Sequence, residues 1–181
     1  MKHDTDSAQL SALPMPNRDH IQGPADAPIK LVEYGDYECP YCGEAYPVVK
    51  AIQRRLGKRL CFAFRNFPLA NSHPHAEHAA EAAESAGGQG RFWEMHDLLY
   101  ENQGALEDDD LARYASDLGL DARRLIGEVQ SGARALRIKE DFRSGAHNGV
   151  NGTPSFFING VRYDGMTEVE ELLSALTGEP V

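Results

Sequence analysis

The stretch KLVEYGDYECPYC, residues 30–42, joins a β-prone run to a Cys-Pro-Tyr-Cys motif that follows it directly. Pro40 suits the first position of a helix, so the pattern predicts a helix from Pro40 to Leu56 that stops at Gly57. Cys39 then lies at the helix start, where unpaired N–H groups and the positive end of the helix dipole favour a thiolate. Such surroundings lower a cysteine pKa from ~8.5 to ~3.5–7.5.

The spacing of these two cysteines predicts a redox-active disulfide between Cys39 and Cys42, because a two-residue spacer lets the sulfurs meet across one helical turn. Cys39 is expected to be the exposed attacking thiol and Cys42 the buried resolving thiol. Half of a zinc site and two structural cysteines are the alternatives. Zinc needs about four ligands, however, and the chain has no second Cys-x-x-Cys pair. The third cysteine, Cys61, lies in an apolar stretch and is expected to be buried and inert.

The sequence beyond the motif predicts an α/β fold. LCFAFRNF (60–67) is typical of a second strand, which a right-handed crossover would make parallel to the first. Residues 72–148 form an alanine-rich helical segment followed by four more helical segments. Strand signals flank this block without a linker, so we expect one central mixed sheet flanked by helices, with an inserted all-helical subdomain at about 72–148.

The C-terminal part of the chain predicts a hairpin and a helix. Asn159-Gly160 is a strong hairpin signal between two short β-prone runs. Thr167 is expected to cap a last helix, with Glu170 completing a capping box three residues later.

Composition excludes several classes of protein. The chain has 181 residues, enough for one domain, with 18 basic and 28 acidic residues and a net charge of −10. That balance disfavours nucleic acid and membrane surfaces as partners. We expect a flexible tail over residues 1–20 and one folded domain over 21–181. Residues 1–20 lack the apolar run of a secretory signal, so we expect a cytoplasmic protein, and a periplasmic location stays open.

Two segments carry a resemblance to a known family. PADAPIKLVEYGDYECPYCGEAYP (24–47) resembles the active-site segment of the DsbA-like thiol-disulfide oxidoreductases, a branch of the thioredoxin superfamily. VNGTPSFFINGVRYDG (150–165) resembles the cis-proline strand and hairpin of that family, and the helical block between them resembles its insertion. The resemblance, which covers about residues 20–177, implies a thioredoxin fold.

The resemblance also implies roles for individual residues. Pro154 matches the cis-proline that faces the cysteine pair, and the Thr153 backbone beside it would bind an extended substrate strand. Pro40 and Tyr41 would complete the substrate contacts. Glu33 matches a buried acid beneath the second cysteine, with a raised pKa, that exchanges a proton with that cysteine. A solvent-facing Glu33 is the alternative, because a slip of one residue along the strand reverses its face.

Two further features leave questions open. Family members that oxidise strongly carry His in the spacer, whereas Tyr41 stands there in this chain, so the direction of electron flow is undecided. His73, His75 and His78 invite a metal interpretation, but no thiolate or carboxylate completes a defined geometry in the sequence. We therefore predict a solvated or capping cluster and no metal site.

These observations predict a dithiol–disulfide oxidoreductase that acts on protein thiols and disulfides through Cys39 and Cys42. It would need no cofactor, would be reset by a small thiol or a redox partner protein, and would act as a monomer. One alternative is a cytosolic reductase that a low-molecular-weight thiol recycles. Another is a non-catalytic, chaperone-like module that binds peptides beside Pro154.

Overall fold

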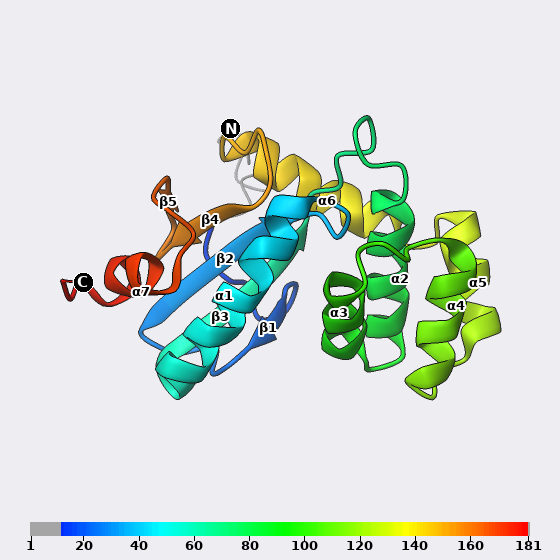
Figure 1. The fold of residues 1–181 in the computed structure, drawn as a ribbon, viewed down its shortest axis with the longest axis horizontal. Helices are drawn as coiled ribbons and strands as arrows, with labels where there is room; N and C mark the ends of the chain where they lie inside the picture. Colours follow the sequence, from blue (N-terminus) through cyan, green and yellow to red (C-terminus); the bar gives the residue numbers. More distant parts are fainter. Residues whose placement is uncertain (1–11, 181) are drawn as a thin grey trace, which may run out of the picture.

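The computed structural model describes residues 12–180, and in this part of the chain five strands form one mixed sheet (Figure 1). Its order is β1-β3-β2-β4-β5, and only the β2–β3 pair is parallel. The strands are β1 (His20–Gln22), β2 (Ile29–Gly35), β3 (Leu60–Asn66), β4 (Ser155–Ile158) and β5 (Val161–Tyr163). The predicted parallel crossover and the hairpin at Asn159-Gly160 are confirmed.

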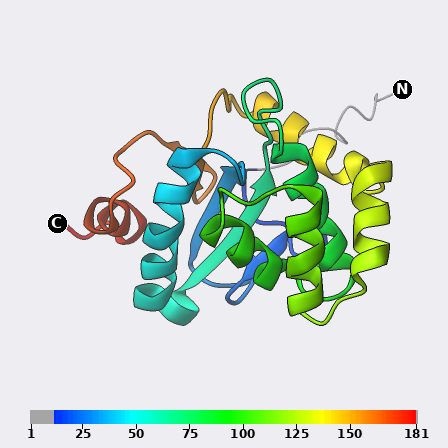
Figure 2. The same ribbon diagram turned by 45° about the vertical axis from the view of Figure 1, so that its right-hand side comes forward.

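Helices cover the sheet and form a separate block beside it. The short η1 (Gly57–Arg59) ends α1 (Pro40–Leu56), which packs with α7 (Val169–Thr177) against the sheet. The inserted helices are α2 (Ala76–Gly88), α3 (Phe92–Glu101), α4 (Asp108–Asp117), α5 (Ala122–Ser131) and α6 (Ala135–His147). Figure 2 shows α2 to α5 stacked together to one side of α1, whereas α6 packs against β3 of the sheet. The thioredoxin fold with a helical insertion is therefore confirmed.

The alternation along β2 divides the core into two parts. Leu31 belongs to the cluster that contains α1, whereas Val32 and Tyr34 belong to the cluster on the opposite face of the sheet. Because side chains alternate along a strand, Glu33 shares the face of Leu31 and points toward α1. The sheet therefore directs one carboxyl group toward the helix that carries the cysteine pair.

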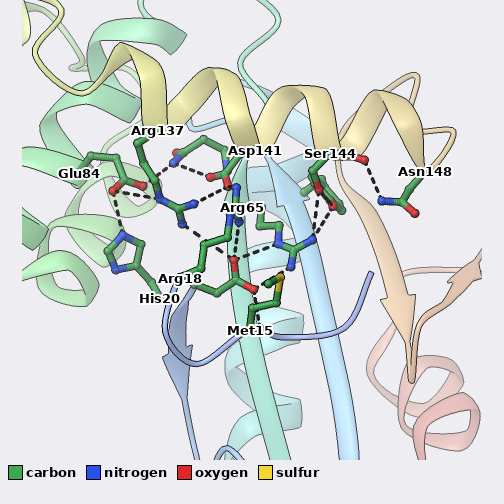
Figure 3. Close-up of polar contacts among 12 residues, drawn as sticks. Met15, Arg18, His20, Arg65, Glu84, Arg137, Asp141, Ser144 and Asn148 are labelled. Atoms are coloured by element: carbon green, nitrogen blue, oxygen red, sulfur yellow. Dashed lines mark hydrogen bonds and ion pairs between the residues drawn. The ribbon is translucent and has the colours of Figure 1, made fainter. Parts of the chain in front are cut away.

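A buried polar network lies on the other side of the sheet, under α6 (Figure 3). Arg65 on β3 is fully buried and donates to Asp19 Oδ2 at 2.8 Å and to the Tyr34 hydroxyl at 2.7 Å. Asp141 on α6 accepts from Arg18 at 2.7 Å. The groups come from four different segments, so the network ties the residues before β1 to the sheet and to α6.

This network corrects the predicted extent of the N-terminal tail. Ala12 is 7% exposed and packs in the second core cluster, and Asp19 is 8% exposed. His20 then pairs with Glu84 of α2 at 2.9 Å. Residues 12–20 therefore belong to the folded domain, because buried charges in the core hold them. Residues 1–11 of the expected tail lie outside the described part of the chain.

Two local predictions were wrong or incomplete. The last helix begins at Val169 with Glu168 as an extended N-cap residue, so Thr167 does not cap it and the predicted capping box does not form. The strand β1 was not predicted, because its three residues are too few to show an alternating pattern.

Candidate active site

The helix start predicted for Cys39 is present. Cys39 is the N-cap residue of α1, with extended backbone angles and Pro40 at the first helical position. Its own N–H donates to the Asp36 carbonyl at 3.2 Å, and its carbonyl accepts from Gly43 N–H at 3.1 Å. The sulfur is therefore held where the first N–H groups of the helix have no helical acceptor.

The sulfur of Cys39 has the surroundings of a stabilised thiolate. A hydrogen bond with the Cys42 thiol lowers its pKa most, and burial opposes this effect. The Thr153 side chain and the N–H groups of Cys42 and Tyr41 lower it further, to about 5. The protonated thiol donates to the Thr153 carbonyl at 3.4 Å, and the buried Thr153 hydroxyl has no other partner among the described residues.

The prediction that Cys39 is exposed was wrong, because only 3% of the residue is accessible. The Thr153 carbonyl and the Cys42 thiol both lie within hydrogen-bond reach of the sulfur. Pro40 and Tyr41 are exposed next to it, with Tyr41 at 68%. A substrate disulfide must therefore reach Cys39 between its exposed spacer residues and the Thr153 loop.

Cys42 is completely buried and differs sharply from Cys39. Burial raises its pKa well above the ordinary value, and the hydrogen bond to Cys39 and the charge of Glu33 raise it further. The Asp36 backbone acts in the opposite direction without reversing the shift. Of the two thiols in the Cys-x-x-Cys motif, both of them free, Cys39 is therefore the better nucleophile, and Cys42 reacts only after it loses a proton.

Glu33 lies where the family resemblance placed it. It is 2% exposed and pairs across the sheet with Phe64 on β3 and Phe156 on β4. Its Oε1 atom has no hydrogen-bond partner among the described residues. Desolvation raises the pKa of Glu33 from 4.5 to about 8. The solvent-facing alternative is therefore excluded, and the raised pKa brings the ionisation of this carboxyl group close to neutral pH.

The peptide bond between Thr153 and Pro154 is cis, as the resemblance implies. Pro154 and Thr153 line a shallow hollow of about 300 Å³ together with Tyr41. Its remaining walls come from α1 and from the loop before α7, namely Glu44, Ala45 and Thr167. All four predicted substrate contacts therefore lie beside the cysteine pair, with Pro40 on its exposed side.

Two residues near the pair were not identified in the sequence. Gln103, in the turn after α3, donates to the Cys39 carbonyl at 2.8 Å and to the Tyr37 carbonyl at 2.9 Å. A Cβ atom at Gly43 would lie 2.0 Å from the Gln103 side-chain oxygen, so glycine is needed for this contact. Asp36 holds the turn before Cys39, because its side chain accepts the Glu38 N–H and its carbonyl accepts the Cys39 N–H. No local motif marks either residue, because their partners are distant in sequence.

The three histidines each pair with a carboxylate. His73 bonds Asp36 at 2.7 Å, His75 bonds Glu38 at 2.9 Å, and His78 bonds Asp108 at 2.7 Å. His75 is the N-cap residue of α2 but makes no side-chain capping bond, and the His73 side chain is only 19% exposed, so the predicted solvated or capping cluster does not describe His73. Cys61, on β3 between β1 and β2, is fully buried, and burial raises its pKa, which agrees with the predicted inert thiol.

A low-pKa thiol at a helix start, a buried second thiol and a cis-proline loop against them define the site of a thiol-disulfide oxidoreductase with a thioredoxin fold. The chain belongs to the family described as Thioredoxin, whose model matches residues 16–177. Among solved structures it is similar to BdbD from Bacillus subtilis, with a TM-score of 0.83 and 21% identity over 96% of this chain and 98% of that one.

Two other relatives extend the comparison. A thioredoxin-like oxidoreductase from Silicibacter pomeroyi is 26% identical, with a TM-score of 0.77, over 87% of this chain and 90% of that one. A protein named Na(+)/H(+) antiporter NhaA 1 from Salinispora arenicola is 47% identical over 90% of this chain. That match takes in 25% of the antiporter, so this chain spans about a quarter of its length. Among the described residues, no helix is long and apolar enough to cross a membrane.

Proposed function

We propose that this protein exchanges disulfides with polypeptide substrates through Cys39, and that Cys42 resolves the mixed disulfide. The observation that carries the proposal is the difference between the two thiols. The pKa of Cys39 is lowered to about 5, whereas burial raises that of Cys42 well above its ordinary value. One cysteine is therefore a thiolate at neutral pH and the other keeps its proton until it is needed.

The exchange balances as two displacements. When the pair is reduced, the Cys39 thiolate attacks one sulfur of a substrate disulfide, and the other sulfur leaves as a thiolate that takes up a proton. The Cys42 thiolate then attacks the Cys39 sulfur, which releases the second substrate thiolate and leaves the Cys39–Cys42 disulfide. The substrate gains two electrons and the enzyme loses two. The same steps in reverse oxidise a substrate dithiol.

Glu33 supplies the proton acceptor for the second displacement. Cys42 must become a thiolate in a buried position, where desolvation opposes the charge. Glu33 lies on the same side of the sheet, its charge acts on Cys42, and its pKa of about 8 lets it exist in both protonation states near neutrality. A group poised in this way can take the proton directly or through water.

Substrates bind as extended polypeptide across the Thr153 loop. The Thr153 carbonyl lies at the attacking sulfur, and the adjoining hollow has an apolar wall from Pro154 and Ala45. An extended chain can hydrogen-bond to a loop backbone and place side chains in such a hollow. Protein thiols and disulfides are therefore the proposed substrates, and a small thiol or a redox partner protein resets the pair.

The direction of exchange follows from the same thiolate. A stabilised Cys39 thiolate stabilises the reduced pair, and this makes the disulfide form the stronger oxidant. We therefore expect a reduction potential on the oxidising side of ~−270 mV, toward the ~−120 mV of a strong oxidant. Equilibration with glutathione measures it. A potential at or below ~−270 mV would instead favour the alternative function, a reductase that a low-molecular-weight thiol recycles.

Covalent trapping tests the proposed roles. Cys42→Ser should accumulate a mixed disulfide with a substrate peptide on a non-reducing gel, because Cys39 attacks and nothing resolves the product. Cys39→Ser should trap nothing and should lose insulin reduction and dithiol oxidation. Exchange that survives in Cys39→Ser would reverse the assignment. A wild-type protein that is inert in both assays and still binds peptide would support the chaperone-like alternative.

The antiporter relatives suggest a setting for this chemistry and not a transport activity of this chain. The matched quarter of those proteins corresponds to the domain that carries the cysteine pair here. We propose that the domain performs disulfide exchange, and a link to a membrane transporter would be tested by co-purification. The cytoplasmic location stays a prediction that cell fractionation tests, and the monomeric state one that size-exclusion chromatography tests.

A further inference from the structure

The loop between β3 and α2 is fastened to the turn that carries Cys39. Phe67 N–H donates to the Gly35 carbonyl at 2.8 Å, and Leu69 N–H donates to Asp36 Oδ2 at 2.8 Å. His75 N–H donates to Glu38 Oε2 at 2.6 Å. These contacts join residues 67–75 to residues 35–38, immediately before the attacking cysteine.

Asp36 is the centre of this junction. It is 1% exposed, and its Oδ1 atom accepts the Glu38 N–H at 2.8 Å. Its Oδ2 atom accepts both the Leu69 N–H and the Nδ1 atom of His73, which lies 2.7 Å away. The Asp36 carbonyl also accepts the Cys39 N–H at 3.2 Å. One residue thus holds both the turn of Cys39 and the ring of His73.

We propose that His73 is a positioning residue for the exchange reaction, an imidazolium that Asp36 holds beside the Cys39 turn so that its charge stabilises the Cys39 thiolate. Only 19% of the His73 side chain is exposed, so the charge is partly screened from water. The spacer residue Tyr41 is uncharged and projects into solvent, so it does not supply this charge. The proposal rests on Cys39 as the reactive thiol.

The electrostatic balance around His73 supports the proposal. Partial burial acts to lower its pKa, but the hydrogen bond to Asp36 and the charges of Asp36, Cys39 and Glu38 raise it above the ordinary value. Attraction between two charges is mutual, so an interaction that favours the imidazolium equally favours the Cys39 thiolate. This contribution is smaller than those of Cys42 and Thr153, which are the larger causes for Cys39.

The chain contains a matched control in the next pair along the loop. His75 also bonds a carboxylate, Glu38, but its ring is 41% exposed. The bond to Glu38 and the charges of Glu38, Glu107 and Asp108 raise its pKa against the effect of burial, and Cys39 is not among the largest causes. Loss of either ring removes one histidine–carboxylate pair from the same loop. Only loss of His73 should change the chemistry of the thiol.

The test compares His73→Asn with His75→Asn and with His73→Lys. Asparagine keeps a donor for Asp36 and removes the charge, whereas lysine keeps a charge. The ultraviolet absorbance of the thiolate against pH gives the Cys39 pKa, and equilibration with glutathione gives the reduction potential. His73→Asn should raise the Cys39 pKa by about half a unit to one unit. Its potential should become more reducing by about 15–30 mV, a threefold to tenfold change in the equilibrium constant.

The outcomes separate charge from structure. His75→Asn should leave both values unchanged, and His73→Lys should restore them in part. A Cys39 pKa that is identical in His73→Asn and wild type, with both proteins folded, would overturn the proposal. An equal shift in His75→Asn would also overturn it, because the effect would then come from the loop. Both readouts apply whether or not a substrate turns over, so failure of the proposed function is seen separately.

Discussion

Replacement of Glu33 by glutamine should change how the stability of the protein depends on pH. Glutamine has nearly the shape of glutamate but does not titrate. In the native protein the Glu33 carboxyl group is buried between Phe64 and Phe156 and its Oε1 atom lacks a partner among the described residues. Desolvation therefore raises its pKa from 4.5 to about 8.

The sign and size follow from proton linkage. Below pH 4.5, the folded and unfolded states both carry the proton, and the group has no effect on the pH dependence. Between pH 4.5 and about 8, the unfolded state has ionised and the folded state still holds its proton, so stability falls as pH rises. The slope is about 1.4 kcal/mol per pH unit, which gives about 3 kcal/mol between about pH 5 and pH 7.5.

Urea unfolding of the reduced protein at these two pH values measures the effect. The free energy of unfolding of Glu33→Gln minus that of wild type should grow by about 3 kcal/mol from the lower to the higher pH. Other titrating groups cancel in the difference. Glu44→Gln, which removes an exposed carboxyl group from α1, controls for the loss of charge alone. A difference between Glu33→Gln and wild type that stays constant with pH would refute a proton held on Glu33.

Three further predictions concern contacts that support the site. Asp19→Asn should cost about 3–5 kcal/mol in urea unfolding, because it leaves the fully buried Arg65 charge without its carboxylate; a cost below about 1 kcal/mol would contradict this. Gln103→Ala should lower the free energy of unfolding by about 1–2 kcal/mol, because two hydrogen bonds are lost. In that variant Gly43→Ala should add up to about 1 kcal/mol of stability, because the Gln103 side chain that the new Cβ atom would meet is gone. Asp36→Asn should destabilise the folded state at neutral pH, since an amide oxygen replaces only one of its two accepting oxygens.

Much of this architecture can be predicted from local motifs and periodic patterns in the sequence. The Cys-x-x-Cys motif after a strand, the hairpin at Asn159-Gly160 and the helical insertion are local signals, and the structure confirms each of them. The burial of Glu33 also follows from alternation once the register of β2 is known. The register was the missing fact, because a shift of one residue would have turned the same carboxyl group toward the opposite face.

The incorrect or missing predictions depend on contacts between distant segments. Cys39 is covered because the Thr153 loop, 114 residues away in sequence, lies against its sulfur. Residues 12–20 are ordered because Asp19 pairs with a buried arginine on β3. His73 belonged to a histidine cluster without an evident partner, and its carboxylate lies 37 residues earlier in the chain. Composition and spacing carry no information about such pairs.

Glu33 and Asp36, three residues apart in the chain, show how the same chemical group acquires opposite roles in two different surroundings. Both are acidic, both are almost completely buried, and both precede Cys39 by a few residues. Asp36 accepts two backbone N–H groups and the His73 ring, so its negative charge stabilises the folded turn. Glu33 lies between two phenylalanines on the neighbouring strands, so burial opposes its negative charge and raises its pKa to about 8. Replacement of the carboxylate by an amide should therefore stabilise the protein at position 33 and destabilise it at position 36 at neutral pH. The first carboxyl group can then move the proton of Cys42, while the second keeps a charge in place for Cys39.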